Sequence, residues 1–386
     1  MNFRTLLLLT AALLVALPAS IAWSNAEAAA RQLPDGEVAP VIYSVHLSDP
    51  QAHNELLEAD LEVLAHDADG VDRYEYRWNR STVGSTASTP AADATVSFAS
   101  LQPETRYVLE VRAVDINGWA SDWVFGADVV SPKPPALIIA GDSVASGYQR
   151  QWFTSKGDCL DREYSYGSTV HRELSDSLPS QWAPTYRNVA WAGAGLHSMA
   201  NGGSDSCGDH HESQLDAIVN AADPSTWNIV VATGGINSTN WSRVVAGLTK
   251  DTAFSFSERG DQQACSAAVS DKWDLPDKTD SVAQAASRIA STLSERTNAS
   301  LFWTSYYTLN GSKLAPGWTP IGTECNDEMS TAMALLHDTL KRGLGDQASW
   351  IDIDLGTVAT QDWGGWPHPD ERGHERIGLI IASKIG

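Results

Sequence analysis

Basic residues are scarce in this sequence. Its 386 residues include 26 Lys and Arg against 48 Asp and Glu, which gives a formal net charge of −22 at pH 7. Nucleic acids and anionic membrane surfaces repel a protein this acidic at long range. We therefore expect no nucleic acid among its partners, whereas the charge favours solubility outside the cell.

Long apolar runs are absent after the first 22 residues, so no later segment is expected to span a membrane. The first segment carries Arg4, then an apolar stretch over residues 6–17, then small residues that end at Ala22. A second acceptable cleavage position follows Ala28. This order of charge, apolar stretch and small residues is typical of a secretory signal peptide, which we assign to residues 1–28.

The alternative is that this segment stays attached as a membrane anchor, since residues 5–22 approach the ~20 apolar residues that cross a bilayer. Pro18 breaks a helix and the Ala-rich tail suits processing, so cleavage is favoured. We therefore predict a protein that is secreted or located at the cell surface.

Cysteine is also rare, and no two cysteines form a C-x-x-C pair. The four are Cys159, Cys207, Cys265 and Cys325. In an exported protein an even number of cysteines favours disulfides, here two of them. Four cysteines can pair in three ways, and the residues alone leave the pairing open.

Internal repeats and low-complexity tracts are missing, and a chain of this length is expected to form two domains. Residues 40–130 contain short alternating runs with little helical periodicity. The clearest runs, residues 107–113 and 74–78, place alternate apolar or aromatic side chains on one face of a strand.

This segment resembles a fibronectin type III module, a β-sandwich of about 90 residues. The matching residues are Leu101, Pro103, Thr105, Tyr107, Val111, Ala113, the Asn117-Gly118 turn and the core tryptophan Trp78. The resemblance implies an all-β sandwich over residues 38–131. Such a module would act as a spacer or as a contact surface for a cell surface or polysaccharide.

Prolines in residues 132–135 favour extended backbone, so this stretch is predicted to be a stiff linker between two domains. After it, predicted strands alternate with predicted helices, which favours an α/β/α three-layer domain with a mostly parallel sheet over residues 136–386. The predicted strands cover residues 136–140, 185–190, 227–233, 301–306 and 350–355. The predicted helices cover residues 165–178, 212–222, 281–297, 328–344 and 371–385.

Four candidate functional residues come after the ends of predicted strands. Ser143 follows the first strand, Gly193 the second and Asn237 the third, and His368 lies in the loop after the last. Ligand sites in parallel sheets form outside the carboxyl ends of the strands. We therefore expect these four residues, spread over most of the domain, to meet at one edge of the sheet.

Their residue types fit acyl transfer. A serine hydroxyl becomes a good nucleophile when a base removes its proton, and His changes its protonation near neutral pH, so Ser143 and His368 supply this pair. Acyl transfer also forms an oxyanion that needs hydrogen-bond donors fixed in advance. We expect the backbone N–H groups of Ser143 and Gly193 and the side-chain amide of Asn237 to supply three.

The sequence around these residues resembles the four signature blocks of the SGNH/GDSL hydrolases, in order. The blocks are Gly141-Asp142-Ser143, Asn188-Val189-Ala190-Trp191-Ala192-Gly193-Ala194, Gly235-Ile236-Asn237, and His368-Pro369 followed by Gly373-His374. The resemblance covers essentially everything after the linker and is greatest to secreted bacterial GDSL esterases and lipases. It implies catalytic roles for Ser143 and His368, and the pairs Cys159 with Cys207 and Cys265 with Cys325. A G-x-S-x-G elbow is absent, which argues against the α/β-hydrolase family.

Two positions depart from the family pattern. Ser238 replaces the usual Asp of the third block, and Gly365 replaces the Asp expected three residues before the histidine. A carboxylate at the second position fixes the imidazole tautomer. Two replacements are open: Asp362, which would complete a triad, or a backbone carbonyl near Gly365, which would leave a Ser-His dyad and is slightly favoured.

The sequence thus predicts a secreted serine ester hydrolase, an esterase or lipase or a carbohydrate deacetylase, that needs no metal or cofactor. The run Asp209-His210-His211-Glu212 has the composition of a metal site but not its spacing, and is read as an exposed helix start. The alternative is an inactive cell-surface binding protein that adheres through the sandwich, which the missing Asp at position 365 favours. Acyl chain length, alcohol part and oligomeric state are left open.

Overall fold

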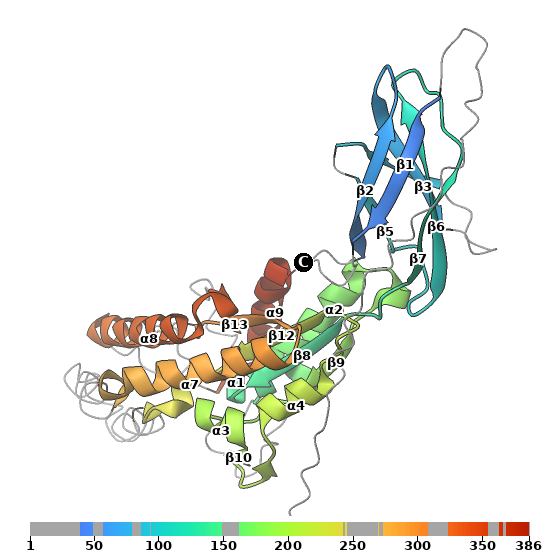
Figure 1. Cartoon of the computed structure of the whole chain (residues 1–386). Helices are drawn as coiled ribbons and strands as arrows, with labels where there is room; N and C mark the ends of the chain where they lie inside the picture. Colours follow the sequence, from blue (N-terminus) through green and yellow to red (C-terminus); the bar gives the residue numbers. More distant parts are fainter. Residues whose placement is uncertain are drawn as a thin grey trace, which may run out of the picture.

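The structure is a computed structural model, and it shows a sandwich part and an α/β part (Figure 1). It describes residues 39–48, 57–78, 86–92, 94–148, 162–241, 244, 269, 273–307, 323–353, 363–365 and 368–385. The predicted signal peptide, residues 1–28, lies outside these ranges. Within them, no helix combines the length and the apolar character that crossing a bilayer requires.

The N-terminal part is the predicted antiparallel sandwich. In the described residues one sheet has the order β1 (Val41–Leu47), β2 (Glu58–His66), β5 (Thr95–Ser97), and the other β4 (Thr86–Pro90), β3 (Val71–Trp78), β6 (Arg106–Asp115), β7 (Val124–Val130). The alternation in β6 is confirmed, because Tyr107, Leu109, Val111 and Ala113 are all buried. Trp78 is buried as well. The narrower assignment to the fibronectin type III family stays a prediction.

The C-terminal part contains the predicted parallel sheet. Its order among the described residues is β14 (Ser349–Ile351), β13 (Ser300–Thr304), β12 (Asn228–Thr233), β8 (Ala136–Gly141), β9 (Thr185–Asn188), and all neighbouring pairs are parallel. The central strands β8 and β12 are buried along their whole length, as expected for a sheet covered on both faces. Strand β9 ends at Asn188, because the Asn188 side chain accepts the N–H of Ala190 at 3.0 Å and turns the chain.

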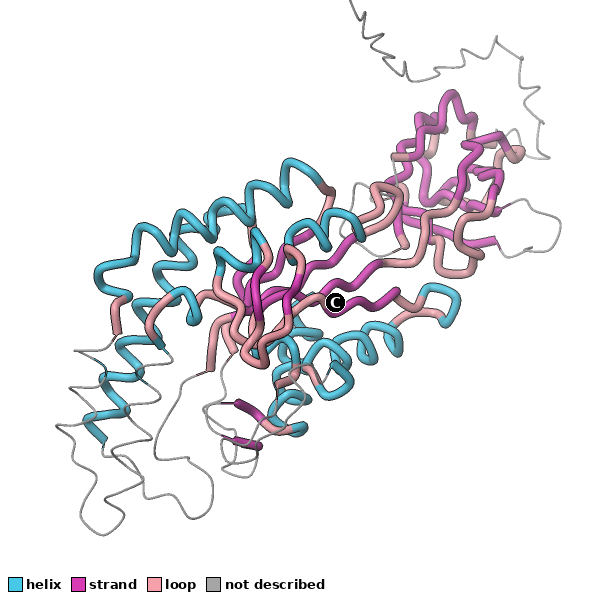
Figure 2. The backbone as a smooth tube through the Cα atoms, turned by 90° about the horizontal axis from the view of Figure 1, so that it is seen from below, coloured by secondary structure: helices cyan, strands magenta, loops and turns pink. Residues whose placement is uncertain are grey.

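Helices cover both sides of this sheet (Figure 2). One group packs together from α3 (Leu196–Asn201), α4 (Gln214–Ala221), α7 (Leu275–Arg296) and α8 (Thr323–Leu344), and a second pair consists of α2 (Tyr166–Ser177) and α9 (Glu371–Ile385). Each predicted helix is present. Helix α7 begins six residues before the predicted start, because Pro276 occupies its first turn, where a proline costs no hydrogen bond.

The linker and the sandwich are fixed to the α/β part. The carbonyls of Pro134 and Pro135 accept hydrogen bonds from the Thr226 hydroxyl (2.6 Å) and the Thr185 N–H (2.8 Å). Both acceptors lie just before the amino end of β8, so the linker is anchored beside the starts of the strands.

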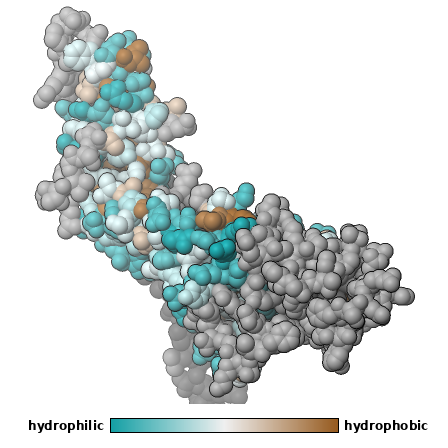
Figure 3. Space-filling model, turned by 180° about the vertical axis from the view of Figure 1, so that it is seen from behind, coloured by the Kyte–Doolittle hydropathy of each residue, from teal (hydrophilic) through white to brown (hydrophobic). Residues whose placement is uncertain are grey.

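A side chain of the α/β part completes the sandwich core. Trp182, in the short helix η2 (Ser180–Trp182), is fully buried within the hydrophobic core of the sandwich. Beside it, Gln181 Nε2 donates to the carbonyl of Ala99 at 3.0 Å. The predicted boundary at residues 132–135 therefore separates two folds but not two independent cores. Seen from behind, the coloured surface of the described residues is mostly hydrophilic with separate apolar patches (Figure 3).

Candidate active site

Ser143 is held at the carboxyl end of the central strand β8. It is the first residue of α1 (Ser143–Ser146), and Asp142 caps this helix by accepting the Val144 N–H at 3.0 Å. Gly141 turns the chain with a φ of 131°, and a Cβ there would lie 1.9 Å from the Thr233 carbonyl oxygen of β12. Only glycine fits this turn, which places the serine hydroxyl at the end of the sheet.

Gln214 supports the same turn from α4, a role that the sequence did not reveal. Its side chain accepts the N–H of Gly141 at 2.7 Å and donates to the Gly141 carbonyl at 2.8 Å. Gln214 is almost completely buried. The backbone next to the serine is therefore held from both of its hydrogen-bonding groups.

Asp142 connects the serine turn to the third-block loop. It is fully buried, and its second carboxyl oxygen accepts a hydrogen bond from the Tyr306 hydroxyl. That hydroxyl also accepts the N–H of Ile236 at 3.3 Å. Burial raises the pKa of Asp142 to about 7, although the hydrogen bonds from Tyr306 and Val144 oppose this rise.

His368 meets Ser143 although 225 residues separate them. Its Nε2 lies 2.8 Å from Ser143 Oγ. The histidine is in β16 (His368–Pro369), which pairs with β15 (Trp363–Gly365) in a two-stranded ladder rather than in the plain loop that was predicted. Tyr148 packs edge-on against the imidazole with ring centroids 4.9 Å apart and helps to orient it.

The other imidazole nitrogen has no orienting partner among the described residues. His368 Nδ1 is buried and forms no hydrogen bond with a described residue, so no described carbonyl near Gly365, the favoured kind of acceptor, binds it. Asp362 lies outside the described residues, so a triad that includes Asp362 stays a prediction. Burial lowers the pKa of His368 to about 4, so the imidazole is neutral at pH 7 and able to accept a proton. His374, also buried, has its pKa lowered to about 3 by burial and by the neighbouring His368.

The second- and third-block loops lie against each other. The Asn237 amide donates a long hydrogen bond of 3.4 Å to the Ala194 carbonyl, and the Ser238 hydroxyl accepts the N–H of Leu196 at 2.8 Å. The serine at position 238 thus joins the two loops, a role that the sequence did not reveal. Gly193 has a φ of 84°, which requires glycine.

Hydrogen-bond donors are free in this region. The backbone N–H groups of Ser143 and Gly193 form no hydrogen bond with any described residue. The amide nitrogen of Asn237 uses one of its two N–H groups on Ala194. The three donors predicted for an oxyanion are therefore available on loops that are tied to one another.

The run from Asp209 to Glu212 is not a helix start. His210–His211 forms β11, which pairs with β10 (Gly203–Ser204), and α4 begins only at Gln214 behind the capping Ser213 hydroxyl. No metal-binding group of three or more His, Cys, Asp or Glu occurs within the described ranges. The helix starts later than predicted because the Ser213 hydroxyl accepts the N–H of Asp216 at 3.0 Å, which places the helix cap at residue 213.

Cysteine pairing is only partly visible. Cys207, in the turn of the β10–β11 hairpin, has no free thiol. Cys159 and Cys265 lie outside the described residues, and the Cys325 side chain is not described either. The sequential pairing therefore stays a prediction.

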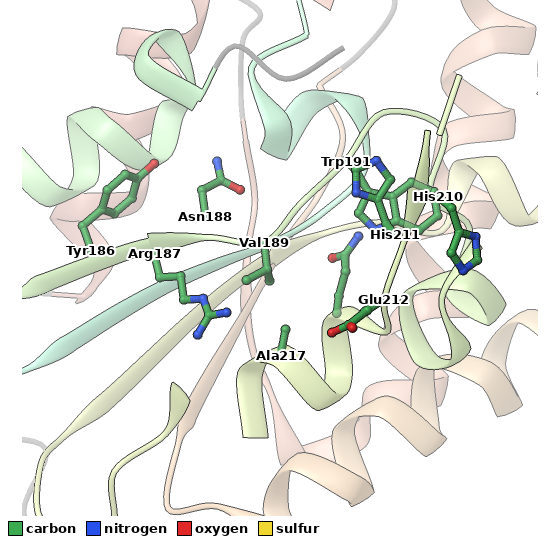
Figure 4. Close-up of a pocket in the computed structure, with 10 residues that line it drawn as sticks. Tyr186, Arg187, Asn188, Val189, Trp191, His210, His211, Glu212 and Ala217 are labelled. Atoms are coloured by element: carbon green, nitrogen blue, oxygen red, sulfur yellow. The ribbon is translucent and has the colours of Figure 1, made fainter. Parts of the chain in front are cut away.

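A cavity of about 540 Å³ lies beside the edge strand β9 (Figure 4). Its lining includes Arg187 of that strand, Val189 just after the strand, Ala217 of α4, and the aromatic rings of Trp191 and His211. Neither Ser143 nor His368 lines it, so this cavity is separate from the serine and histidine.

No protein-family model matches the chain, and no curated protein is similar to it in sequence. Solved structures resemble it at low identity. Phospholipase A1 from Streptomyces albidoflavus NA297 is 17% identical with a TM-score of 0.44, over 65% of this chain and 98% of that one. An extracellular lipase from Streptomyces rimosus is 13% identical with a TM-score of 0.42, over 65% and 98%. An acetylxylan esterase from Geobacillus stearothermophilus is 13% identical with a TM-score of 0.36, over 66% and 94%.

Proposed function

We propose that the protein is a serine ester hydrolase that acts through an acyl-enzyme intermediate on Ser143. The observation that supports this most is the 2.8 Å contact between His368 Nε2 and Ser143 Oγ. A nucleophile and a base within hydrogen-bond reach are the minimum for this chemistry. The turn that requires glycine at position 141 fits the same reaction, and so does the backbone N–H of Ser143, which bonds to no described residue.

In the proposed reaction, neutral His368 takes the proton of the Ser143 hydroxyl as its oxygen attacks the ester carbonyl. The carbonyl oxygen becomes an oxyanion, which the N–H groups of Ser143, Gly193 and Asn237 stabilise. Protonated His368 then gives its proton to the leaving alcohol, and an acyl group remains on Ser143. Water, deprotonated by His368, attacks the acyl carbon and releases the acid, which restores both residues.

A fluorophosphonate probe tests whether Ser143 is activated. Wild-type protein should be labelled, and Ser143→Ala and His368→Ala should lose labelling, because only an activated serine attacks the phosphorus. Ser146→Ala is the matched control, since among the described residues the Ser146 hydroxyl donates only to the Ser143 carbonyl, at 3.2 Å. A wild-type protein that stays unlabelled while folded would favour the alternative, a binding protein with an inactive hydrolase fold.

The substrate class can be determined by comparing the hydrolysis of different esters. Hydrolysis of p-nitrophenyl esters of increasing chain length, measured beside acetate release from acetylated xylan and pectin, separates the three candidates. A lipase prefers long acyl chains, a simple esterase prefers short ones on any alcohol, and a carbohydrate deacetylase releases acetate from the polysaccharides. Ser143→Ala should abolish every one of these activities.

We also infer export through residues 1–28, which supports the expectation of disulfides. Expression of the full chain in a secreting bacterial host should yield a protein in the culture medium whose first residue, by N-terminal sequencing, follows Ala22 or Ala28. Retention of the intact chain in the membrane fraction would indicate an anchor instead.

A further inference from the structure

The β10–β11 hairpin, residues 203–211, contacts the second-block turn at consecutive residues. The His211 ring stacks on the Trp191 ring with centroids 5.2 Å apart and planes 14° from parallel, and Figure 4 shows the two rings against each other. The next residue along the turn, Ala192, accepts the Ser206 N–H at 3.0 Å through its carbonyl. The hairpin thus holds both residues that precede Gly193.

The third contact falls on Gly193 itself. A Cβ at this position would lie 2.5 Å from the Ser206 hydroxyl oxygen, so Ser206 occupies the space beside the glycine. The positive φ of Gly193 and this neighbour both exclude a side chain. Residues 191, 192 and 193 therefore each touch the same hairpin.

Asp205 holds the hairpin turn in shape. Its side chain is buried, and its Oδ1 accepts the N–H groups of Cys207 (2.8 Å) and Asp209 (2.9 Å). Its Oδ2 pairs with His211 Nε2 at 2.8 Å. Burial by itself would raise the pKa of Asp205, but the bonds from His211 and the two N–H groups outweigh it and keep the pKa below its usual value.

We propose that the Asp205–His211 pair positions the N–H of Gly193 for the oxyanion. The pair ties the turn that carries Ser206 to the ring that stacks on Trp191, so both contacts on the Gly193 loop depend on it. Asp205 and His211 are positioning residues, because they act through the hairpin on the loop. The proposal rests on the proposed hydrolase function.

The test compares two substitutions within the pair with one beside it. Asp205→Asn keeps an oxygen for the two N–H groups but not the acceptor for His211, and His211→Ala removes both the pair and the ring stack. His210→Ala is the matched control, because His210 is the exposed neighbour on the same strand. Turnover of p-nitrophenyl acetate, the rate of fluorophosphonate labelling and hydrogen exchange of the peptide containing Gly193 are measured for each.

A displaced oxyanion donor weakens the transition state more than the ground state. We expect kcat and the labelling rate to fall about 10- to 100-fold in both pair variants, with KM within about twofold. Hydrogen exchange of the Gly193 peptide should rise in both, and His210→Ala should match the wild type in every measurement.

Two results would overturn the positioning role. One is a kcat within about twofold of wild type in both pair variants, and the other is unchanged exchange of the Gly193 peptide. A wild-type protein without turnover or labelling would instead contradict the hydrolase function. The exchange measurement needs no turnover, so it still decides whether the pair holds the loop.

Discussion

The neutral, buried imidazole of His368 fixes the expected pH dependence. His368 acts as a base only when its imidazole is unprotonated. Because its pKa is about 4, the imidazole becomes protonated only in acidic solution. We expect kcat/KM for p-nitrophenyl acetate to be flat around neutral pH and to fall as the pH drops through about 4. Initial rates from a stopped assay across this range provide the measurement.

A midpoint near 6.5, the ordinary value for histidine, would contradict this expectation. It would show that an acceptor, such as the carboxylate of Asp362, stabilises the imidazolium through Nδ1. Asp362→Asn is therefore the companion variant. With Nδ1 unpaired, as in the described residues, this substitution should leave the acidic limb unchanged.

A second prediction concerns the contribution of Gln214 to stability. Gln214→Met keeps the shape of the side chain but leaves the buried N–H of Gly141 without its partner, which should lower the free energy of unfolding by roughly 1–3 kcal/mol. Urea unfolding followed by circular dichroism measures the change. Asn220→Ala, an exposed position on the same helix, should stay within about 0.5 kcal/mol of wild type. Equal stability of the two variants would contradict the role assigned to Gln214.

The contact between Ser143 and His368 could be predicted from the sequence, while the side chains that support the serine turn could not. Ser143, Gly193, Asn237 and His368 stand at positions that strand ends make visible in a sequence. The partner of Gly141, in contrast, is a glutamine 73 residues away. A buried polar side chain leaves no periodic pattern in the sequence, because the tertiary fold decides which backbone N–H or carbonyl it binds.

At the scale of elements, the contact between α2 and α9 supports the histidine. A Cβ on Gly378 of α9 would lie 2.5 Å from the Thr169 Cβ and 2.7 Å from the Tyr166 carbonyl oxygen of α2. Gly378→Ala should therefore push the two helices apart, lower the unfolding free energy by about 1–3 kcal/mol and reduce kcat/KM, since α9 follows His368 directly.

Thermal unfolding and ester hydrolysis of the same samples test this prediction. Ser383→Ala, at an exposed position near the end of α9, is the control and should leave both unchanged. A Gly378→Ala protein as stable as wild type would mean that the helices can move apart without cost.

Elements were predicted well where apolar periodicity is strong and less well at their ends. Strand β8 and helix α9 have the predicted extents to within one residue. Helix α4 starts two residues after its predicted start, because the Ser213 hydroxyl captures the Asp216 N–H. Cap chemistry of this kind is local, and the polar run that precedes it resembles a first helical turn.

At the scale of the whole molecule, Trp182 couples the two folds. Trp182→Ala removes a fully buried ring from the sandwich core and should lower stability by about 3–5 kcal/mol. Calorimetry should show a single transition for the wild type and two separate transitions for the variant. Trp119→Ala, which truncates an exposed ring in the sandwich, is the control and should keep one transition.

Two transitions in the wild type would contradict this coupling. The sequence suggested a spacer joined by a stiff linker, because composition marks where the chain changes character but not which distant side chain fills the end of a core. Trp182 lies 51 residues after Ser131, in a stretch that has the pattern of a connecting loop.

The position of the sandwich has a consequence for how the protein would meet its substrate. The sandwich docks where the strands of the parallel sheet begin, and the serine lies where they finish (Figure 1). A surface bound by the sandwich would therefore lie on the opposite side of the molecule from Ser143. If the proposed hydrolase function holds, an enzyme with this arrangement would act on esters that approach from the medium or from a second surface, rather than on the surface to which the sandwich is bound.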